Sequence, residues 1–165
     1  MTKTAIELIQ NSRLQSWLED PGSFIERLKR NQLCPQIIVL RQGWHYPSPA
    51  ERLCLKVRLR CYAFIREVEI RYENQPIMFA RTTIPASTLT GQERRLTQLG
   101  ASSLGSVLFS YPGVMRSAFE IKTCRLLRYS ASELWERQSF FYLKRKPLLL
   151  TEVFLPPFLR IIKSL

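Results

Sequence analysis

Apolar and polar residues alternate along much of the chain, which is the pattern of β-strands that bury one face. The longest alternation runs from Cys61 to Tyr72 and ends at a turn sequence, ENQP, at 73–76. A second alternating run, Ile77 to Ile84, follows at once, so we expect the two runs to pair as an antiparallel hairpin. Further strands are predicted at 37–40, 54–60, 118–128, 134–144 and 147–155.

Capping residues and helical spacing predict the helices. Ser23 follows the helix-breaking sequence at 20–22 and is a candidate N-cap. Thr90 and Glu93 have the spacing of a capping box, and Gly100 is a natural C-cap. Helices are therefore expected over 4–18, 24–29, 91–99 and 103–109.

This order of helices, strands, a helix pair and further strands predicts the fold class. The chain has 165 residues, which fits a single domain covering 1–165. Connections of hairpin length favour an antiparallel sheet. We therefore expect an α+β fold in which a roughly six-stranded antiparallel sheet is flanked by helices.

The formal net charge is +12, from 25 Lys and Arg against 13 Asp and Glu. Such a charge attracts nucleic acid, acidic lipid or a small anionic substrate. The basic residues are spread along the chain without a block of five or six, so we expect no nucleic-acid partner. The tail at 158–165 mixes apolar and basic residues; packing on the core is the favoured interpretation, and weak contact with an anionic membrane surface is the alternative.

The sequence also bears on compartment and metal content. No apolar run approaches the roughly 18 residues that cross a bilayer, and the first ten residues lack a signal-peptide pattern. The chain has one histidine, His45, and four scattered cysteines without a CxxC pair, so neither a zinc site nor disulfides are expected. We expect a cytoplasmic, monomeric protein without a metal.

Charged residues interrupt two otherwise apolar strand faces. Arg66 lies in the middle of the apolar face of the 61–72 strand, and Glu152 is the one charge in the 147–155 strand. A buried charge costs several kcal/mol unless it is paired. The two residues therefore either form an internal salt bridge or line a pocket, in which arginine holds an anion and glutamate handles protons. Arg81 and Arg125 also fall on apolar faces and would add to such an anion site.

Other catalytic patterns are weak. A Ser/His/Asp triad would have to use His45 and Asp20, the one aspartate, and neither lies in a nucleophile motif. The segment GASSLG at 100–105 resembles a phosphate-binding loop only loosely, because it lacks the GKS or GKT ending and follows no strand.

Several motifs resemble the bacterial chorismate pyruvate-lyase (chorismate lyase) family. ARTTIPASTLTG at 80–91 resembles the family's GRTVVPxSTLxG, and LGASSLGSVLF at 99–109 is similar to its LGxxPLGxxLF. FIREV at 64–68 resembles WxREV, and KPLLLTEVFLP at 146–156 is similar to the ending KPLLLTExFLP. The entry, with WL at 17–18 and PGS at 21–23, also fits, so the resemblance covers nearly the whole chain.

The resemblance implies an activity, a site and a fold. The family converts chorismate to 4-hydroxybenzoate and pyruvate, an early step of ubiquinone biosynthesis, without a metal or organic cofactor. Its antiparallel sheet carries helical flaps over a buried ligand site. Carried over by motif, the catalytic residues are Arg66 and Glu152, and the substrate-binding residues are these two with Phe24 and Leu104.

The resemblance also implies roles for these residues. Arg66 is expected to bind the ring carboxylate through a charge-assisted pair of hydrogen bonds, and Glu152 to hydrogen-bond the C4 hydroxyl and assist proton transfer. Leu104 and Phe24, the latter through its backbone, would shape the flaps that exclude water. The chain departs from the family pattern at Phe24-Ile25, at Ala80 for glycine and at Ser103 for proline, which affects the flaps more than the chemistry.

Two other functions stay open at this point. The first is a ligand-sensing domain of the type attached to GntR transcription regulators, which would bind a small effector without turnover. The second is a basic protein that binds nucleic acid or a membrane surface, which the charge alone suggests and which predicts binding that falls steeply with salt.

Overall fold

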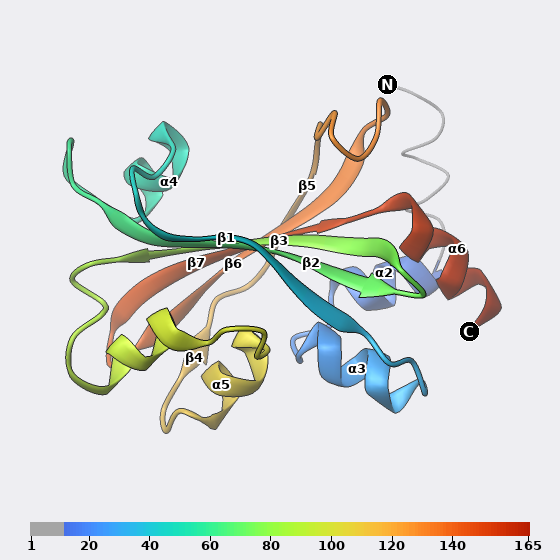
Figure 1. The fold of residues 1–165 in the computed structure, drawn as a ribbon, viewed down its shortest axis with the longest axis horizontal. Coiled ribbons are helices and arrows are strands. Elements are labelled where there is room, and N and C mark those ends of the chain that lie inside the picture. The colour runs from blue at the N-terminus through green and yellow to red at the C-terminus, as the bar shows by residue number, and fades with distance from the viewer. Residues whose placement is uncertain (1–11) are drawn as a thin grey trace.

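An antiparallel sheet organises the computed structural model, which describes residues 12–165 (Figure 1). Within these residues the sheet has seven strands in the order β1-β2-β3-β7-β6-β4, and β5 pairs with β6. Every pairing is antiparallel, which confirms the α+β class with one strand more than expected. The strands are β1 (Gln36–His45), β2 (Ala63–Tyr72), β3 (Gln75–Pro85), β4 (Met115–Arg116), β5 (Glu120–Cys124), β6 (Leu134–Leu143) and β7 (Lys146–Phe154).

Two tight hairpins set the register. Glu73 and Asn74 join β2 to β3, and Lys144 and Arg145 join β6 to β7, all four with positive φ. This backbone matches the twist of the flanking strands in two-residue hairpins. The sheet therefore consists of a β1-β2-β3 half and a half built on β6-β7, which are joined by the pairing of β3 with β7.

Helices cover parts of the sheet and close one end. They are α2 (Ser12–Leu18), α3 (Phe24–Arg30), α4 (Pro49–Cys54), the 3-10 helix η1 (Gly91–Gln98), α5 (Leu104–Ser110) and α6 (Pro156–Ser164). The part of the helix predicted over 4–18 that falls on 1–11 lies outside the described residues. Ser23 and Ser103 cap α3 and α5 through their hydroxyl groups, which confirms the predicted N-cap at Ser23. Among the described residues, no helix is long and apolar enough to cross a membrane.

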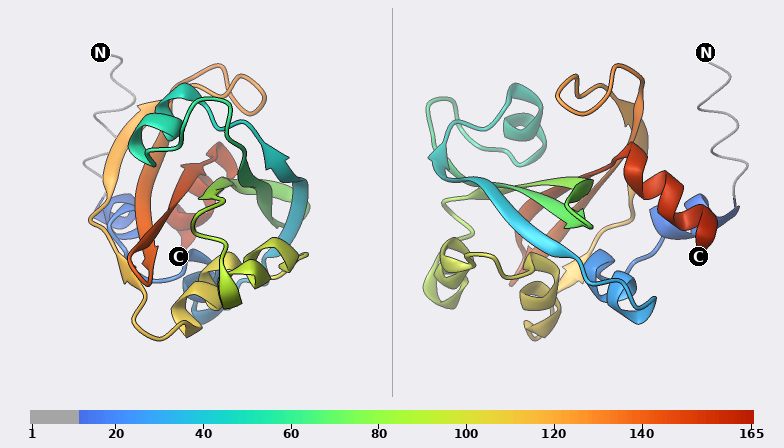
Figure 2. Two further views of the ribbon diagram at one scale, coloured as in Figure 1. Left: turned by 90° about the vertical axis from the view of Figure 1, so that its left-hand side faces the viewer. Right: turned by 45° about the vertical axis from the view of Figure 1, so that its right-hand side comes forward.

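The tail and the flap segments pack on two main apolar clusters. Phe158 and Ile162 of α6 are buried with the side chains of α2 and α3, so the tail packs on the core. Leu96 of η1 and Leu104 of α5 are buried in a second cluster on the sheet. Figure 2 shows the α2–α3 and η1–α5 segments on the same side of the curved sheet.

Three of the predicted strands differ from the structure. The segment 54–60 is no strand: it forms the last residue of α4 and the turns after it, where Leu55 is buried and Leu59 is exposed. Strand β1 runs on to His45, five residues past the end of the strand expected over 37–40, and β5 occupies only five residues of the strand expected over 118–128.

The helix expected over 91–99 is a 3-10 helix, and Thr90 makes no side-chain cap. Glu93 is 1% exposed and pairs instead with Lys144, at 3.2 Å, and Lys146, at 3.6 Å. Thr90 and Glu93 therefore do not form the predicted capping box. Glu93 instead forms tertiary ion pairs that link η1 to the β6-β7 hairpin.

Candidate active site

A cavity lies between the inner face of the sheet and the two helical segments. About 540 Å³ between them is not filled by atoms, part of it open to the solvent. Alternate residues of β2, β3 and β7 form its floor, and the starts of α3 and α5 form its roof. Its lining is Gly22, Ser23, Phe24, Ile25, Ile37, Arg66, Val68, Ile70, Ala80, Thr82, Ser103, Leu104, Gly105, Phe109, Arg116, Phe141, Leu150 and Glu152. The structure thus places all four predicted site residues, Phe24, Arg66, Leu104 and Glu152, around one cavity.

Arg66 of β2 enters the cavity wall with part of its guanidinium uncommitted. The residue is 4% exposed, and its Nη2 donates to the carbonyl oxygens of Gly100, at 2.9 Å, and Ser102, at 3.0 Å. Among the described residues, no group accepts a hydrogen bond from its buried Nε. Burial lowers the pKa of Arg66. An arginine with an unpaired N–H in a cavity wall is a binding group for an anion.

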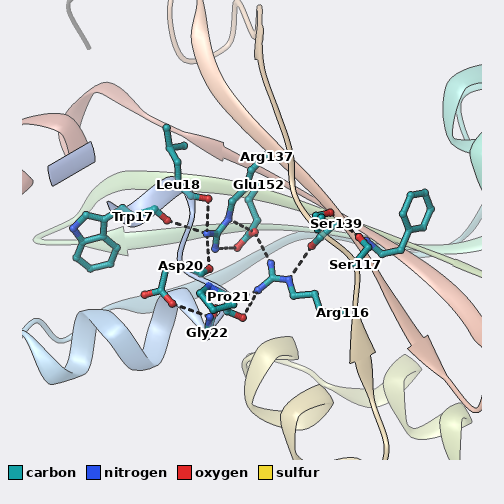
Figure 3. A network of polar contacts seen from close by, with 12 residues as sticks. Trp17, Leu18, Asp20, Pro21, Gly22, Arg116, Ser117, Arg137, Ser139 and Glu152 are labelled. Carbon is teal, nitrogen blue, oxygen red and sulfur yellow. Dashed lines mark hydrogen bonds and ion pairs between the residues drawn. The ribbon is translucent and has the colours of Figure 1, made fainter. Parts of the chain in front are cut away.

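Glu152 of β7 is held by two arginines (Figure 3). Its cross-strand neighbour Arg137 donates from Nε to Oε2 at 2.6 Å and from Nη2 to Oε1 at 3.1 Å. Arg116 donates from Nη2 to Oε2 at 3.2 Å. Of the two alternatives from the sequence, the salt bridge between Glu152 and Arg66 is therefore wrong, because the β6-β7 register supplies Glu152 with a nearer partner. A carboxylate has about four acceptor positions, so one remains for a ligand hydroxyl.

Arg137 binds the C-terminal end of α2 in addition to Glu152. It is 1% exposed, and its Nη1 donates to the carbonyl oxygens of Trp17, Leu18 and Asp20 at 2.9, 3.3 and 3.1 Å. These carbonyl groups lie at the end of α2 and just beyond it, where helical acceptors lack partners. The sequence interpretation missed Arg137, although a two-residue turn at 144–145 would have placed it opposite Glu152.

Arg116 of β4 connects Glu152 to the turn between α2 and α3. Its Nη1 donates to the carbonyl oxygens of Pro21, at 3.0 Å, and Gly22, at 3.2 Å, and its Nε donates to Ser139 Oγ at 3.0 Å. Burial, opposed in part by the Glu152 carboxylate and aided by Arg137, lowers the pKa of Arg116 to about 10. Arg116 therefore stays cationic at neutral pH. No sequence signal pointed to it, because a two-residue strand shows no alternation.

The two helical segments meet above the cavity. A Cβ on Gly105 would lie 3.0 Å from Ser23 Oγ, and Ser106 Oγ donates to Glu26 Oε1 at 3.3 Å. The Phe24 ring packs away from this contact in the core, with its centroid 5.2 Å from that of Phe158. The expected helical flaps are thus present, and glycine at 105 permits their close approach.

Arg81 and Arg125 do not join the cavity, contrary to expectation. Arg81 lies on the other face of β3, where it donates to Glu51 from Nε at 2.7 Å and from Nη2 at 2.9 Å and also pairs with Glu67. Arg125 is exposed beyond the end of β5. The arginines at the cavity are instead Arg66 and Arg116, with Arg137 behind Glu152.

The charged side chains of the cavity lining, together with Arg137 behind Glu152, sum to +2. Three guanidiniums, of Arg66, Arg116 and Arg137, face one carboxylate, that of Glu152, in a largely apolar surrounding. A cavity of low polarity strengthens the electrostatic attraction between these charges and a bound anion. A ligand with two acidic groups would balance the net charge. In residues 12–165, no three His, Cys, Asp or Glu side chains are grouped to hold a metal ion.

Comparisons with known proteins agree on the family. The family model described as chorismate lyase matches residues 2–162. A probable chorismate pyruvate-lyase of Methylococcus capsulatus is 36% identical over 163 residues, which are 92% of this chain and 99% of that protein. A chorismate pyruvate-lyase of Hamiltonella defensa is 39% identical over 144 residues, 85% of this chain and 76% of that protein.

Solved structures share the fold at low sequence identity. The effector domain of PhnF from Mycobacterium smegmatis superposes with a TM-score of 0.61 at 13% identity, covering 82% of this chain and 90% of that one. The ligand-binding domain of a putative GntR-family regulator from Bordetella bronchiseptica gives 0.53 at 10% identity, covering 74% and 85%. At such identities the likeness concerns the fold alone, whereas the sequence matches extend over nearly the whole chain. This chain belongs to the chorismate lyase family.

Proposed function

We propose that this protein is a chorismate pyruvate-lyase, which converts chorismate to 4-hydroxybenzoate and pyruvate in an early step of ubiquinone biosynthesis. The observation that carries the proposal is the +2 cavity, in which Arg66 keeps an unpaired N–H and Glu152 keeps an acceptor position. The proposal includes one domain over 1–165 that acts in the cytoplasm as a monomer, without a cofactor or a nucleic-acid partner.

Chorismate carries two carboxylates, and the cavity offers a cation for each. Arg66 binds the ring carboxylate through Nε and the rest of its uncommitted edge. Arg116 uses one Nη2 hydrogen on Glu152, and its second is directed to the carboxylate of the enolpyruvyl side chain. Both contacts are charge-assisted, which makes them stronger than neutral hydrogen bonds.

Elimination then needs the hydrogen on C4 and the ether oxygen on C3 to leave together. The C4–H electrons form the new C3–C4 double bond of the aromatic ring, the C3–O bond breaks, and enolpyruvate departs to become pyruvate. Glu152 accepts a hydrogen bond from the C4 hydroxyl and so fixes the ring. The C4 proton goes either to Glu152, at the acceptor position that the hydroxyl then gives up, or to the methylene carbon of the departing group. Holding the side chain in a reactive conformer assists both routes.

The apolar roof and floor serve the same reaction. Leu104 and Phe141, with Val68 and Leu150, line the cavity beside the charged groups. They exclude water, which would otherwise screen the charges and compete for Glu152. Phe24 contributes its backbone at the start of α3, since its ring is committed to the core.

The first experiment incubates purified protein with chorismate in EDTA and measures 4-hydroxybenzoate by absorbance and pyruvate by a coupled assay. Equimolar products are expected. Arg66→Ala should lose activity while remaining folded by circular dichroism, and Arg125→Ala, at an exposed arginine, should not. Tight binding of 4-hydroxybenzoate without turnover would instead indicate a sensor on a lyase fold, as the GntR-type relatives suggest.

Glu152→Gln separates the two proton routes. The amide keeps the size and one acceptor oxygen but removes the base. If Glu152 takes the proton, kcat should fall by about a hundredfold or more. If the proton passes within the substrate, the loss of kcat should stay below about tenfold, with most of the effect on KM.

A further inference from the structure

Large apolar side chains are exposed to solvent at the end of the molecule that carries α4. Leu53 is 81% exposed, Leu59 70%, Tyr46 57% and Tyr62 50%. The Tyr46 and Tyr62 rings stack with centroids 4.4 Å apart, and Tyr46 and Leu59 border one shallow hollow. In Figures 1 and 2 this region lies at the opposite end of the molecule from α6.

The same segment of the chain carries more basic than acidic residues. Between residues 44 and 62 the basic residues are Arg52, Lys56, Arg58 and Arg60. The one acid there is Glu51, which is 7% exposed and bound to Arg81 on the sheet. We call the four apolar residues Tyr46, Leu53, Leu59 and Tyr62 with these four basic residues the α4 patch.

The fold holds these residues at the surface. The capping box of Ser48 and Glu51 begins α4, and Leu55, which follows the helix, is buried at 5% exposure whereas Leu53 and Leu59 are exposed. Lys56 and Arg60 take positive φ, 54° and 65°, where glycine or asparagine is usual.

We propose that the α4 patch docks on an anionic membrane surface. Leucine side chains enter the boundary of the acyl chains, tyrosines favour the headgroup level, and arginine and lysine pair with lipid phosphate. A second copy of this chain does not fit, because two such patches would bring their cations together. Nucleic acid fits less well, because the exposed leucines cannot stack on bases as aromatic rings do.

The test is sedimentation of the full chain with vesicles of phosphatidylcholine alone or of equal parts phosphatidylcholine and phosphatidylglycerol. Binding is expected to the anionic vesicles only and to fall with salt. Lys56→Gln with Arg58→Gln should weaken partitioning by about fivefold for each charge removed. Leu53→Ser with Leu59→Ser should weaken partitioning by at least about tenfold, because two leucine side chains no longer insert into the membrane.

Matched controls separate the patch from the overall charge. Arg125→Gln with Arg145→Gln removes two exposed cations elsewhere, and Leu127→Ser removes a leucine that is also 81% exposed. These should bind as the parent does, and all variants should keep lyase turnover, since no patch residue lines the cavity. Equal losses in the controls, equal binding to both vesicles, or tighter binding to RNA than to anionic vesicles would overturn the proposal.

An optical signal gives an independent readout. Trp44, two residues before Tyr46 of the patch, is 49% exposed, whereas Trp17 and Trp135 are 4% and 8% exposed. Quenching by brominated phospholipid should therefore report on Trp44 when the patch is docked. Unquenched fluorescence in sedimented protein would show that another face binds and would refute the proposal.

Discussion

The two arginines bound to Glu152 differ in what else they hold. Arg137 lies behind the cavity and donates to three backbone carbonyl groups, whereas Arg116 lies in the cavity lining and can also reach a ligand. Removing one partner of a buried ion pair leaves a charge without compensation. At the scale of single residues, we therefore expect Arg137 to act on stability. The arginines that line the cavity, Arg116 and Arg66, are expected to act on binding.

The first prediction compares two substitutions of equal size. Arg137→Met should lower the free energy of unfolding by about 3–5 kcal/mol, because Glu152 loses its two-pronged partner. Arg66→Met should cost much less, since Arg66 has no carboxylate partner among the described residues. Urea unfolding measures both, and equal losses would show that Arg137 has no special structural role.

The second prediction concerns acid stability through Glu51. Burial opposes the charge of Glu51, but hydrogen bonds from Arg81, Thr83 and the Ser48 backbone outweigh it and lower the pKa from 4.5 to about 2. Because the folded-state pKa is depressed, this stabilisation is complete above about pH 4.5 and is lost as the pH falls toward 2. It amounts to on the order of 2 kcal/mol at neutral pH.

Glu51→Gln tests this directly. The variant should be less stable than the parent at pH 7, and the difference should shrink as the pH falls from 4.5 to 2. Thermal unfolding across this range is the measurement. A difference that does not change with pH would show that the carboxylate charge is not the cause.

Arg66 and Glu152 could be predicted from the sequence because each is a lone charge in an otherwise apolar strand face. Arg81 looked similar but pairs with Glu67 and Glu51 on the other face, which no single strand pattern reveals. Arg116 reaches the cavity through tertiary packing alone. Alternation therefore identifies unusual positions within a strand, whereas the side of the sheet and the partner depend on neighbouring elements.

At the scale of elements, one capped helix and one tight hairpin could be predicted from local signals. Ser23 caps α3 as expected, and the β2-β3 hairpin forms at the expected turn. The segment 54–60 could not, because a basic and apolar alternation on an exposed turn has the same sequence pattern as a half-buried strand. Burial is a tertiary property, and the alternation alone does not specify it.

The third prediction concerns the contact between the flaps. Gly105→Ala places a methyl group 3.0 Å from Ser23 Oγ, the capping atom of α3, so the flaps must separate by a few tenths of an ångström. The Kd for 4-hydroxybenzoate should rise by about fivefold, equivalent to about 1 kcal/mol. Titration calorimetry measures it.

Ser110→Ala is the control for this prediction. It alters helix propensity at the exposed end of the same helix α5, away from the α3 contact. Its Kd should match that of the parent. An unchanged Kd in Gly105→Ala would mean that the flap contact does not govern ligand retention.

At the scale of the whole molecule, the cavity spans the junction between the two halves of the sheet. Arg66 and Thr82 come from the β1-β2-β3 half, and Leu150, Glu152 and Arg116 come from the other. A ligand held by residues of both halves joins them. The fourth prediction is that 4-hydroxybenzoate at a hundred times its Kd raises the free energy of unfolding by about 2.7 kcal/mol.

Calorimetric melting with and without this ligand makes the measurement. Arg66→Ala provides the control, because it removes the anion contact and should abolish the shift in Tm. A shift that persists undiminished in Arg66→Ala would place the ligand elsewhere on the protein.

The junction also determines when during folding the cavity can exist. Each hairpin closes over a two-residue turn, but Ala80 pairs with Glu152, which lies 72 positions further along the chain. Contacts between distant segments form late because the loop between them loses entropy on closure. Arg66 and Glu152 therefore meet only when the chain has completed its slowest pairing. A nascent or cleaved half of the molecule can have a good hairpin and still no site, so binding competence reports the completion of folding itself.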